Sequence, residues 1–168
     1  LRSQFFFVLS GVDEVVERFK ALRDKHGSGV DIGVDFHGAV QPPTALQLVK
    51  ALEPCQPWFY EEIVQALNID VMAEIAAKTH IPIATGERLV SMFEFQNLFA
   101  EGACAFAQPD LGSCGGITAC KKIATLAEAN YVLMAPHVWG GPIITAAAMQ
   151  ICANVPNFLV QESIYKSG

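Results

Sequence analysis

The sequence predicts an α/β fold with parallel strands, organised as a (β/α)8 TIM-type barrel of which only part is present. Short apolar runs rich in β-branched and aromatic residues alternate with amphipathic or alanine-rich stretches, which is typical of parallel strands joined by helical crossovers. The units recur about every 25 residues, and this regular spacing favours a barrel over an open sheet. Hydrophobic residue types make up 52% of the 168 residues and charged types 17%, so the chain can bury a core.

Six strands and six helices follow from these patterns. The predicted strands, each a short apolar run that can be buried on both faces, cover residues 30–36, 58–60, 81–85, 103–108, 131–135 and 157–161. The predicted helices, each amphipathic or alanine-rich, cover residues 12–25, 44–52, 69–79, 92–100, 118–129 and 143–152.

Residues typical of helix ends support several of these boundaries. His26 and Gly27 end the first helix, and Gly102 follows the fourth. Asn68 or Asp70 can cap the third helix at its N-terminus.

The number of units indicates an incomplete barrel, because a complete one usually needs about 250 residues. About six βα units are present, and residues 5–9 are a weaker strand candidate, so one or two units are expected to be missing. The chain begins with Leu1 rather than Met, as expected for a fragment. We interpret residues 1–10 as an atypical N-terminal segment and residues 11–168 as one partial barrel domain without an internal linker.

Charge and cysteine content restrict the expected partners and compartment. Eleven basic and 17 acidic residues give a net charge of −6 without a basic run, which argues against nucleic acid and anionic membranes as partners. No apolar run approaches the roughly 20 residues that cross a bilayer. The five cysteines form no C-x-x-C pair, so we expect reduced thiols in a cytoplasmic protein. A nucleophilic cysteine is the weaker alternative.

An ionisable residue follows each predicted strand, in phase with the repeat. These residues are Asp35, Glu61, Glu87, Asp110, His137 and Glu162. Their successive separations are 26, 26, 23, 27 and 25 residues. Because the carboxyl ends of parallel strands surround a common mouth, the sequence predicts an active site there.

Three carboxylates from consecutive strands point to a metal ion. Asp35, Glu61 and Glu87 would repel one another and lose hydration if they met without a cation. Ligation by oxygen alone favours Mg²⁺, or Mn²⁺, and leaves coordination positions open for substrate and water. The alternative interpretation is that these acidic residues are unrelated and cap the helices that follow.

Two histidines are candidates for proton transfer. His37 lies two residues after Asp35, so an extended strand would place both on the same side. Asp110 can accept a hydrogen bond from His137 and raise the basicity of its other ring nitrogen, which makes the pair a plausible general base. His26 and His80 are interpreted as structural residues at helix ends. The glycine-rich run at residues 112–116 fits a tight turn better than a phosphate-binding loop.

Seven short motifs contain or flank these residues. They are Val34-Asp35-Phe36-His37-Gly38, Phe59-Tyr60-Glu61-Glu62, Ile83-Ala84-Thr85-Gly86-Glu87-Arg88, Gln108-Pro109-Asp110-Leu111, Gly115-Gly116-Ile117-Thr118, Ala135-Pro136-His137 and Val160-Gln161-Glu162. In order and spacing the set resembles the barrel domain of the enolase superfamily, in its mandelate racemase and muconate lactonizing enzyme branch. Within that branch it most resembles sugar-acid dehydratases of the galactonate dehydratase type.

The resemblance implies a role for each residue. Asp35, Glu61 and Glu87 would bind Mg²⁺, and His137 with Asp110 would remove the proton α to the substrate carboxylate. His37 would protonate the departing 3-hydroxyl, and Glu162 would hydrogen-bond the carboxylate as it becomes an enediolate. The implied reaction converts a sugar acid, such as galactonate, to a 2-keto-3-deoxy acid.

Some features depart from the family or leave alternatives open. Ile63 stands where the family usually has proline, and the first barrel strands and the N-terminal capping domain are expected to be missing. No Lys-x-Lys element typical of related racemases is visible, which favours a dehydratase. A racemase or epimerase, and a truncated non-catalytic fragment, are the alternatives. An exposed barrel edge would favour a homo-oligomer.

Overall fold

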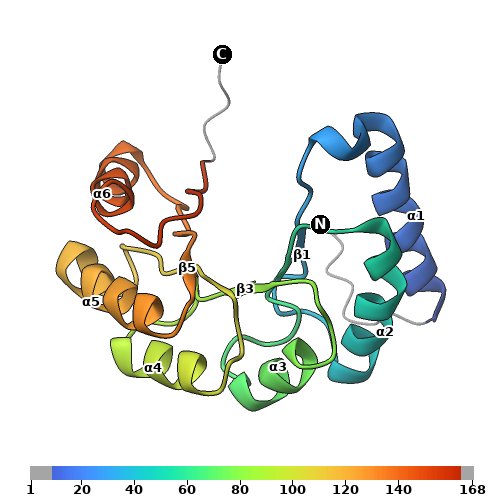
Figure 1. The fold of residues 1–168 in the computed structure, drawn as a ribbon, viewed down its shortest axis with the longest axis horizontal. Coiled ribbons are helices and arrows are strands. Elements are labelled where there is room, and N and C mark those ends of the chain that lie inside the picture. Colours follow the sequence, from blue (N-terminus) through green and yellow to red (C-terminus); the bar gives the residue numbers. More distant parts are fainter. Residues whose placement is uncertain (1–8, 164–168) are drawn as a thin grey trace. The chain divides into compact units, whose positions relative to one another are not determined.

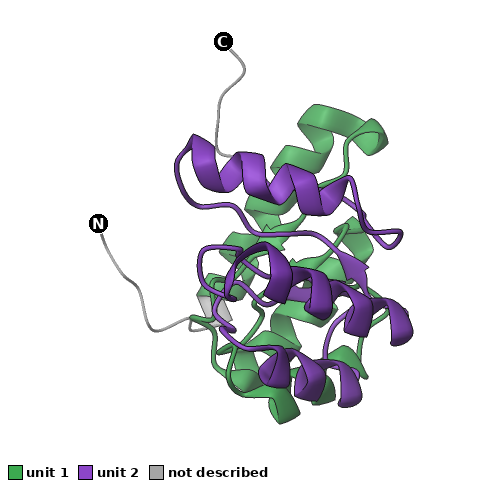
Figure 2. Cartoon of the chain, turned by 90° about the vertical axis from the view of Figure 1, so that its left-hand side faces the viewer, with its two compact units in different colours: residues 1–83 green, residues 84–168 purple. Residues whose placement is uncertain are grey.

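A computed structural model describes residues 9–163 of the chain. The predicted strand at residues 5–9 lies outside these residues except for Leu9, which begins a helix. The chain forms two compact units, residues 1–83 and 84–168, whose boundary falls within one strand (Figure 2).

Unit 1 alternates helices and short parallel strands. In chain order its elements are α1 (Leu9–His26), η1 (Gly27–Gly29), β1 (Val34–Asp35), α2 (Pro42–Leu52), η2 (Glu53–Cys55), β2 (Tyr60–Glu61) and α3 (Ile69–Ala76). Strands β1 and β2 pair in parallel, with Asp35 opposite Glu61. The Tyr60 N–H donates to the Pro82 carbonyl at 2.9 Å, just before β3 begins at Ile83. The last residues of β1 and β2 therefore lie side by side.

The helices of unit 1 bury one apolar face. In α2 the buried residues Ala45, Leu48, Val49 and Leu52 recur at the three- and four-residue spacing of a helical stripe. Helix α2 packs against α1 and α3 (Figure 1). The buried Tyr60 hydroxyl donates to the Val49 carbonyl at 3.1 Å, and burial raises the pKa of Tyr60.

Arg23 connects α1 to the segment that enters β1. Its guanidinium donates to the carbonyls of Gly27, Val30 and Gln56 at 3.0, 2.7 and 3.0 Å. These three carbonyls lie outside the strands, and the bonds to Arg23 hold the segment that leads into β1 in place.

Unit 2 continues the same alternation. Its elements are β3 (Ile83–Thr85), α4 (Met92–Ala100), β4 (Phe106–Ala107), α5 (Gly116–Ala129), β5 (Leu133–Met134) and α6 (Pro142–Cys152). Strand β4 pairs in parallel with both β3 and β5. Helix α5 packs against α4 and α6 (Figure 1). Within unit 2 the strand order is therefore β3-β4-β5.

A capping box begins α4. The Glu94 N–H donates to the Ser91 hydroxyl at 3.4 Å, and the Glu94 carboxylate accepts from the backbone N–H groups of Val90 and Ser91 at 3.0 and 2.8 Å. Desolvation acts to raise the pKa of Glu94, but hydrogen bonds from the Ser91 hydroxyl and these N–H groups outweigh it and lower the pKa. The N-terminus of the helix that follows β3 is therefore well defined.

The predicted strand at residues 157–161 is wrong. Only an isolated parallel bridge joins Phe158 to Met134. The segment still runs along β5, because Met134 N–H donates to Asn157 O and Leu159 N–H donates to Met134 O, both at 2.8 Å. The Asn157 amide donates to the carbonyls of Ala124 and Val132, which ties the segment to α5 and to the residue before β5. Hydrogen bonds from the Asn157 side chain, and not a regular strand ladder, thus hold this segment in place.

The α/β prediction is confirmed. All six predicted helices are present, with ends that differ by at most three residues, while the strands are two or three residues long and lie inside the predicted runs or next to them. Asn68 is the N-cap of α3, although its side chain makes no capping hydrogen bond. None of the five cysteines forms a disulfide. Among the residues that the structure describes, no helix has the length and apolarity of a bilayer span.

Candidate active site

The carboxyl ends of β1 and β2 place two carboxylates next to each other in unit 1. Asp35 and Glu61 are the last residues of their strands and register partners. Asp35 is exposed and Glu61 is half-buried. Adjacent carboxylates open to solvent have the hard oxygen donors that Mg²⁺ prefers, so this pair fits the predicted metal.

His37 lies beside Asp35 for a reason other than the one predicted. Strand β1 ends at Asp35, and His37 has a positive φ of 52°, so strand alternation does not apply and that argument is wrong. Instead, the Asp35 carboxylate accepts from the His37 N–H at 2.7 Å in a local turn. This turn brings the His37 Nδ1 atom to 3.7 Å from Asp35 Oδ2.

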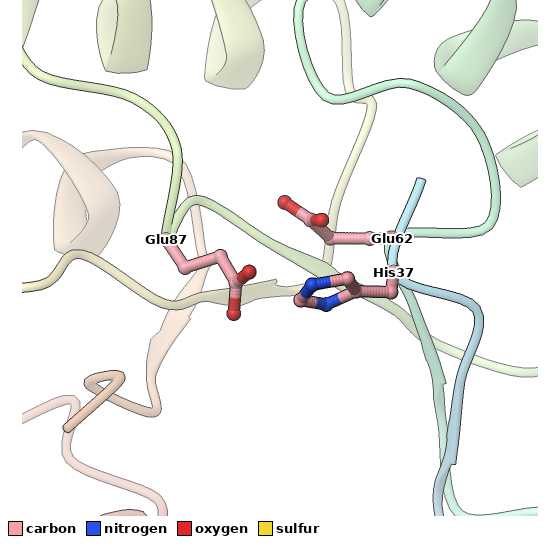
Figure 3. Close-up of side chains that lie close together, drawn as sticks. All are labelled: His37, Glu62 and Glu87. Carbon is pink, nitrogen blue, oxygen red and sulfur yellow. The ribbon is translucent and has the colours of Figure 1, made fainter. Parts of the chain in front are cut away.

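Glu62 is a candidate that the sequence reasoning missed. It is fully buried and has a positive φ of 40°, and its carbonyl accepts from the Gly38 N–H at 2.8 Å. A carboxylate oxygen of Glu62 and a ring nitrogen of His37 lie within 4.8 Å of each other (Figure 3). The double glutamate was the available signal, but only its first member follows the 26-residue spacing.

Asp110 and His137 form a tight pair in unit 2. Asp110 Oδ2 lies 2.7 Å from His137 Nδ1, while Asp110 Oδ1 accepts from the Gly112 N–H at 2.6 Å. Asp110 is buried, and its carbonyl accepts from the N–H groups of Ser113 and Cys114. A carboxylate held in this way can accept a hydrogen bond from Nδ1–H, which leaves the Nε2 atom of the imidazole able to take up a proton.

Glu87 lies next to the other ring nitrogen of His137, Nε2. His137 Nε2 lies 3.3 Å from Glu87 Oε2, and Arg88 Nε lies 3.5 Å from Glu87 Oε1. The preceding Gly86 has φ 136°, and a Cβ atom there would meet the Phe95 ring at 2.8 Å and the Gln108 nitrogen at 3.1 Å. Glycine is therefore required to place Glu87 after β3.

Glu162 reaches the pair from the C-terminal segment. The Glu162 N–H donates to the Pro136 carbonyl at 3.3 Å, and Glu162 Oε2 accepts from the Val138 N–H at 2.9 Å. The same oxygen lies 3.7 Å from His137 Nε2. Glu162 is thus positioned although its segment is not a regular strand.

The remaining candidates are thiols and the glycine-rich turn. Burial raises the pKa of Cys104 to about 12, which makes it a poor nucleophile. A hydrogen bond from Cys120 lowers the pKa of Cys114, and the same contact raises that of Cys120. In the glycine-rich run, Gly115 has φ 100° and is the N-cap of α5, as a tight turn requires.

The predicted site residues thus gather in two groups. Asp35, Glu61 and His37 lie together in unit 1. Glu87, Asp110, His137 and Glu162 lie together in unit 2. The meeting of Asp35, Glu61 and Glu87 around one ion stays a prediction. The group in unit 2 can take up a proton at His137 Nε2 in a site lined by carboxylates.

Comparison with known families decides the relationship. The family model described as enolase C-terminal domain-like matches residues 4–168. The chain belongs to this family. It is also 46% identical over 151 residues to a D-galactonate dehydratase of Variovorax paradoxus. The aligned region covers 90% of this chain and 40% of that relative. The chain thus spans about 40% of the length of the curated relative.

Solved structures of this family share the fold. A candidate mandelate racemase/muconate lactonizing enzyme from Burkholderia superposes with a TM-score of 0.93 at 39% identity, over 96% of this chain and 40% of that one. An enolase from Agrobacterium radiobacter, a candidate galactarate dehydratase bound to sodium and L-malate, has a TM-score of 0.88 at 35% identity, over 93% and 40%. The prediction of an enolase-superfamily barrel of the galactonate dehydratase type is therefore confirmed.

Proposed function

We propose that the chain carries the proton-transfer residues of a Mg²⁺-dependent dehydratase, which converts a sugar acid such as galactonate to a 2-keto-3-deoxy acid. The observation that carries the proposal is the 2.7 Å contact between Asp110 and His137, with His137 Nε2 facing Glu87 and Glu162. The D-galactonate dehydratases among the relatives support this choice of substrate.

His137 is the base in this proposal. With Nδ1–H donating a hydrogen bond to Asp110, the imidazole takes the proton from the carbon next to the substrate carboxylate at Nε2. Asp110 does not take up that proton. It fixes the tautomer and stabilises the imidazolium that forms.

The carboxylates would hold the metal. Asp35, Glu61 and Glu87 are the ligands proposed for Mg²⁺, with Mn²⁺ as a substitute. When bound, the ion would supply positive charge that offsets the negative charge developing on the substrate carboxylate as the α-proton leaves. Glu162 would carry a proton on the oxygen that does not accept from Val138, and it would donate a hydrogen bond from that oxygen to the same carboxylate.

Loss of water completes the reaction. The electron pair of the broken C–H bond forms a double bond to the neighbouring carbon, and the hydroxyl on that carbon leaves as water with a proton from His37. The resulting enol becomes the 2-keto-3-deoxy acid by tautomerisation. The turn that places His37 beside Asp35 supports this assignment, because it puts an imidazole next to a proposed metal ligand.

A racemase or epimerase is the second candidate, because structural relatives include mandelate racemase-like enzymes. Such an enzyme would return a proton to the same carbon instead of expelling water. A non-catalytic fragment is the third, since the chain spans about 40% of the relatives.

The test is incubation with galactonate and Mg²⁺, followed by assay for the 2-keto-3-deoxy product. The chain is assayed alone and joined to the sequence encoded upstream of it. His137→Asn should abolish product formation, whereas the control His26→Asn, at the end of α1, should not. Exchange of the α-proton with solvent deuterium without product would favour the epimerase. If neither form gives product or exchange, the fragment interpretation holds.

A further inference from the structure

Glu87 and Arg88 occupy the two middle positions of a turn that follows β3. The turn closes where the Leu89 N–H donates to the Gly86 carbonyl at 3.0 Å. Both of its ends are fixed, because Gly86 lies close against the Phe95 ring and Leu89 is fully buried. The turn therefore carries two neighbouring side chains of opposite charge on a well-defined backbone.

The segment after the turn is also held in place. The Glu94 carboxylate of the capping box accepts from the N–H groups of Val90 and Ser91 at 3.0 and 2.8 Å. Arg88 thus lies between two stretches of chain whose backbone groups are hydrogen-bonded. Its guanidinium starts from a fixed position next to Glu87, and only side-chain torsions remain to be set.

The Glu87 carboxylate has a different neighbour at each of its two oxygens. Arg88 Nε lies 3.5 Å from Oε1, and His137 Nε2 lies 3.3 Å from Oε2. The Glu87 side chain is only 10% exposed, so solvent screens its contact with the guanidinium less than it would at the surface. Arginine keeps its positive charge at any ordinary pH, whereas a neutral imidazole offers the carboxylate no charge.

A carboxylate between these two neighbours can turn toward either. If Glu87 turned fully toward His137, it would occupy the Nε2 atom that the proposed base needs for the substrate. The contact with Arg88 at the opposite oxygen opposes that rotation, because a planar guanidinium holds a carboxylate in a preferred orientation. A group next to a metal ligand can in this way fix where the ligand points.

We propose that Arg88 is a positioning residue for Glu87. It holds the carboxylate in the orientation that binds Mg²⁺ and keeps it from turning onto His137 Nε2. The inference rests on the proposed function, because it takes Glu87 to be a metal ligand. It deepens that proposal by naming a residue that acts on the metal site through another side chain.

The charge of Arg88 makes this proposal testable, because positioning and simple electrostatics predict opposite results. A positive charge beside a metal site repels the ion, so removal of that charge alone should tighten Mg²⁺ binding. Loss of a group that orients a ligand should instead weaken Mg²⁺ binding, by about 10- to 100-fold.

Titration calorimetry with Mg²⁺ measures this difference without substrate. Arg88→Met removes the charge and the contact while keeping a long side chain, and we expect it to lower the affinity by about tenfold or more. Arg88→Lys keeps the charge but not the planar group, so it should also weaken binding. Lys122→Met, which removes an exposed positive charge from α5, is the matched control and should leave the affinity nearly unchanged.

The calorimetry is carried out on the chain alone and joined to the sequence encoded upstream of it, and circular dichroism checks that each variant folds. The proposal is overturned if Arg88→Met binds Mg²⁺ as tightly as the unaltered protein or more tightly. It is also overturned if neither form of the unaltered protein binds Mg²⁺, because Glu87 would then not be a metal ligand.

A double variant tests whether Arg88 acts through Glu87. In Glu87→Gln the charged ligand is already lost, so adding Arg88→Met should lower the Mg²⁺ affinity much less than the same substitution does in the unaltered protein. Equal losses in the two backgrounds would contradict the proposal.

Turnover of galactonate separates this proposal from the dehydratase itself. Arg88→Met should need more Mg²⁺ for product formation and should recover in part as Mg²⁺ is raised, which a misfolded variant would not do. Product formation with an unchanged Mg²⁺ dependence would remove Arg88 from the site and leave the dehydratase standing. Weakened Mg²⁺ binding in Arg88→Met, without product from the unaltered protein, would keep the role of Arg88 and remove the dehydratase.

Discussion

The two units hold their candidate site residues in different ways. In unit 1, Asp35 and His37 are exposed, and a single local turn joins them. In unit 2, the Asp110 and His137 side chains are only 10% and 16% exposed, and hydrogen bonds hold both oxygens of Asp110. Hydrogen bonds within unit 2 thus orient the proposed base. The carboxylates of unit 1 can adjust, as ligands that must fit an ion and a substrate should.

Asp110→Asn should have the largest effect, a loss of catalytic activity. Asparagine keeps an acceptor for Gly112 N–H but presents an amide N–H₂ group or an uncharged oxygen to His137 Nδ1, so the tautomer and the imidazolium lose support. We expect turnover of the sugar acid to fall by about 10³- to 10⁴-fold, as in other histidine–aspartate pairs. The rate constant kcat measures the effect, and an unchanged kcat would remove Asp110 from the mechanism. Asp31→Asn, in the segment before β1, is the control.

Gly86→Ala should cost stability, because the residue combines φ 136° with a Cβ atom 2.8 Å from the Phe95 ring. We expect the free energy of unfolding to fall by about 2–4 kcal/mol in urea denaturation. Gly102→Ala is matched to it, since Gly102 has φ 64° and no atom within 4 Å of its would-be Cβ. That control should lose only about 1 kcal/mol. Equal losses would show that backbone conformation alone matters at Gly86.

Removing one proposed metal ligand should weaken Mg²⁺ binding. Titration calorimetry of Glu87→Gln, Asp35→Asn and Glu61→Gln should each show affinity reduced by about tenfold or more, because a neutral amide replaces a charged oxygen ligand. Glu162→Gln, which alters a carboxylate proposed to contact substrate, should bind Mg²⁺ nearly as the unaltered chain does. If Glu87→Gln keeps the original affinity, the ligand assignment is wrong.

Ser91→Ala should have the smallest effect, a loss of about 1 kcal/mol from the capping box. The contribution of Glu94 depends on pH. Its pKa is lowered in the folded state, so its stabilisation is present above the ordinary glutamate pKa and disappears as the pH falls through the folded value. The difference between Ser91→Ala and the unaltered chain in thermal unfolding should therefore shrink below about pH 4. A constant difference would contradict the role of the charged carboxylate.

Periodicity predicted the helices well because each carries a buried apolar stripe, such as Leu48, Val49 and Leu52 in α2. The strands were less predictable, because only two or three residues, mostly toward the carboxyl end of each predicted run, pair regularly. The 25-residue spacing predicted that Asp110, His137 and Glu162 follow successive strands, and their side chains lie near one another in unit 2. It cannot anticipate that Glu162 follows β5 through a segment held by Asn157.

Other features of the site depend on backbone conformations that residue types do not reveal. His37 and Glu62 both have positive φ, a conformation that is uncommon for residues other than glycine. A pocket in unit 2 lies where Trp139 and the start of α6 face the turn at Asp110 and Gly112. These two segments are separated by about 30 residues in the chain. The apolar residues of this pocket have no strand phase or motif that would mark them.

The turn around Asp110 has a thermal consequence. The Asp110 carboxylate accepts from the Gly112 N–H, and the Asp110 carbonyl accepts from the N–H groups of Ser113 and Cys114. The Gly116 N–H donates to the Leu111 carbonyl. Amide protons engaged in this way exchange with deuterated water only when the surrounding structure opens. Heating should consequently leave the proton-accepting imidazole correctly oriented until unit 2 itself melts, so that inactivation and unfolding coincide in temperature.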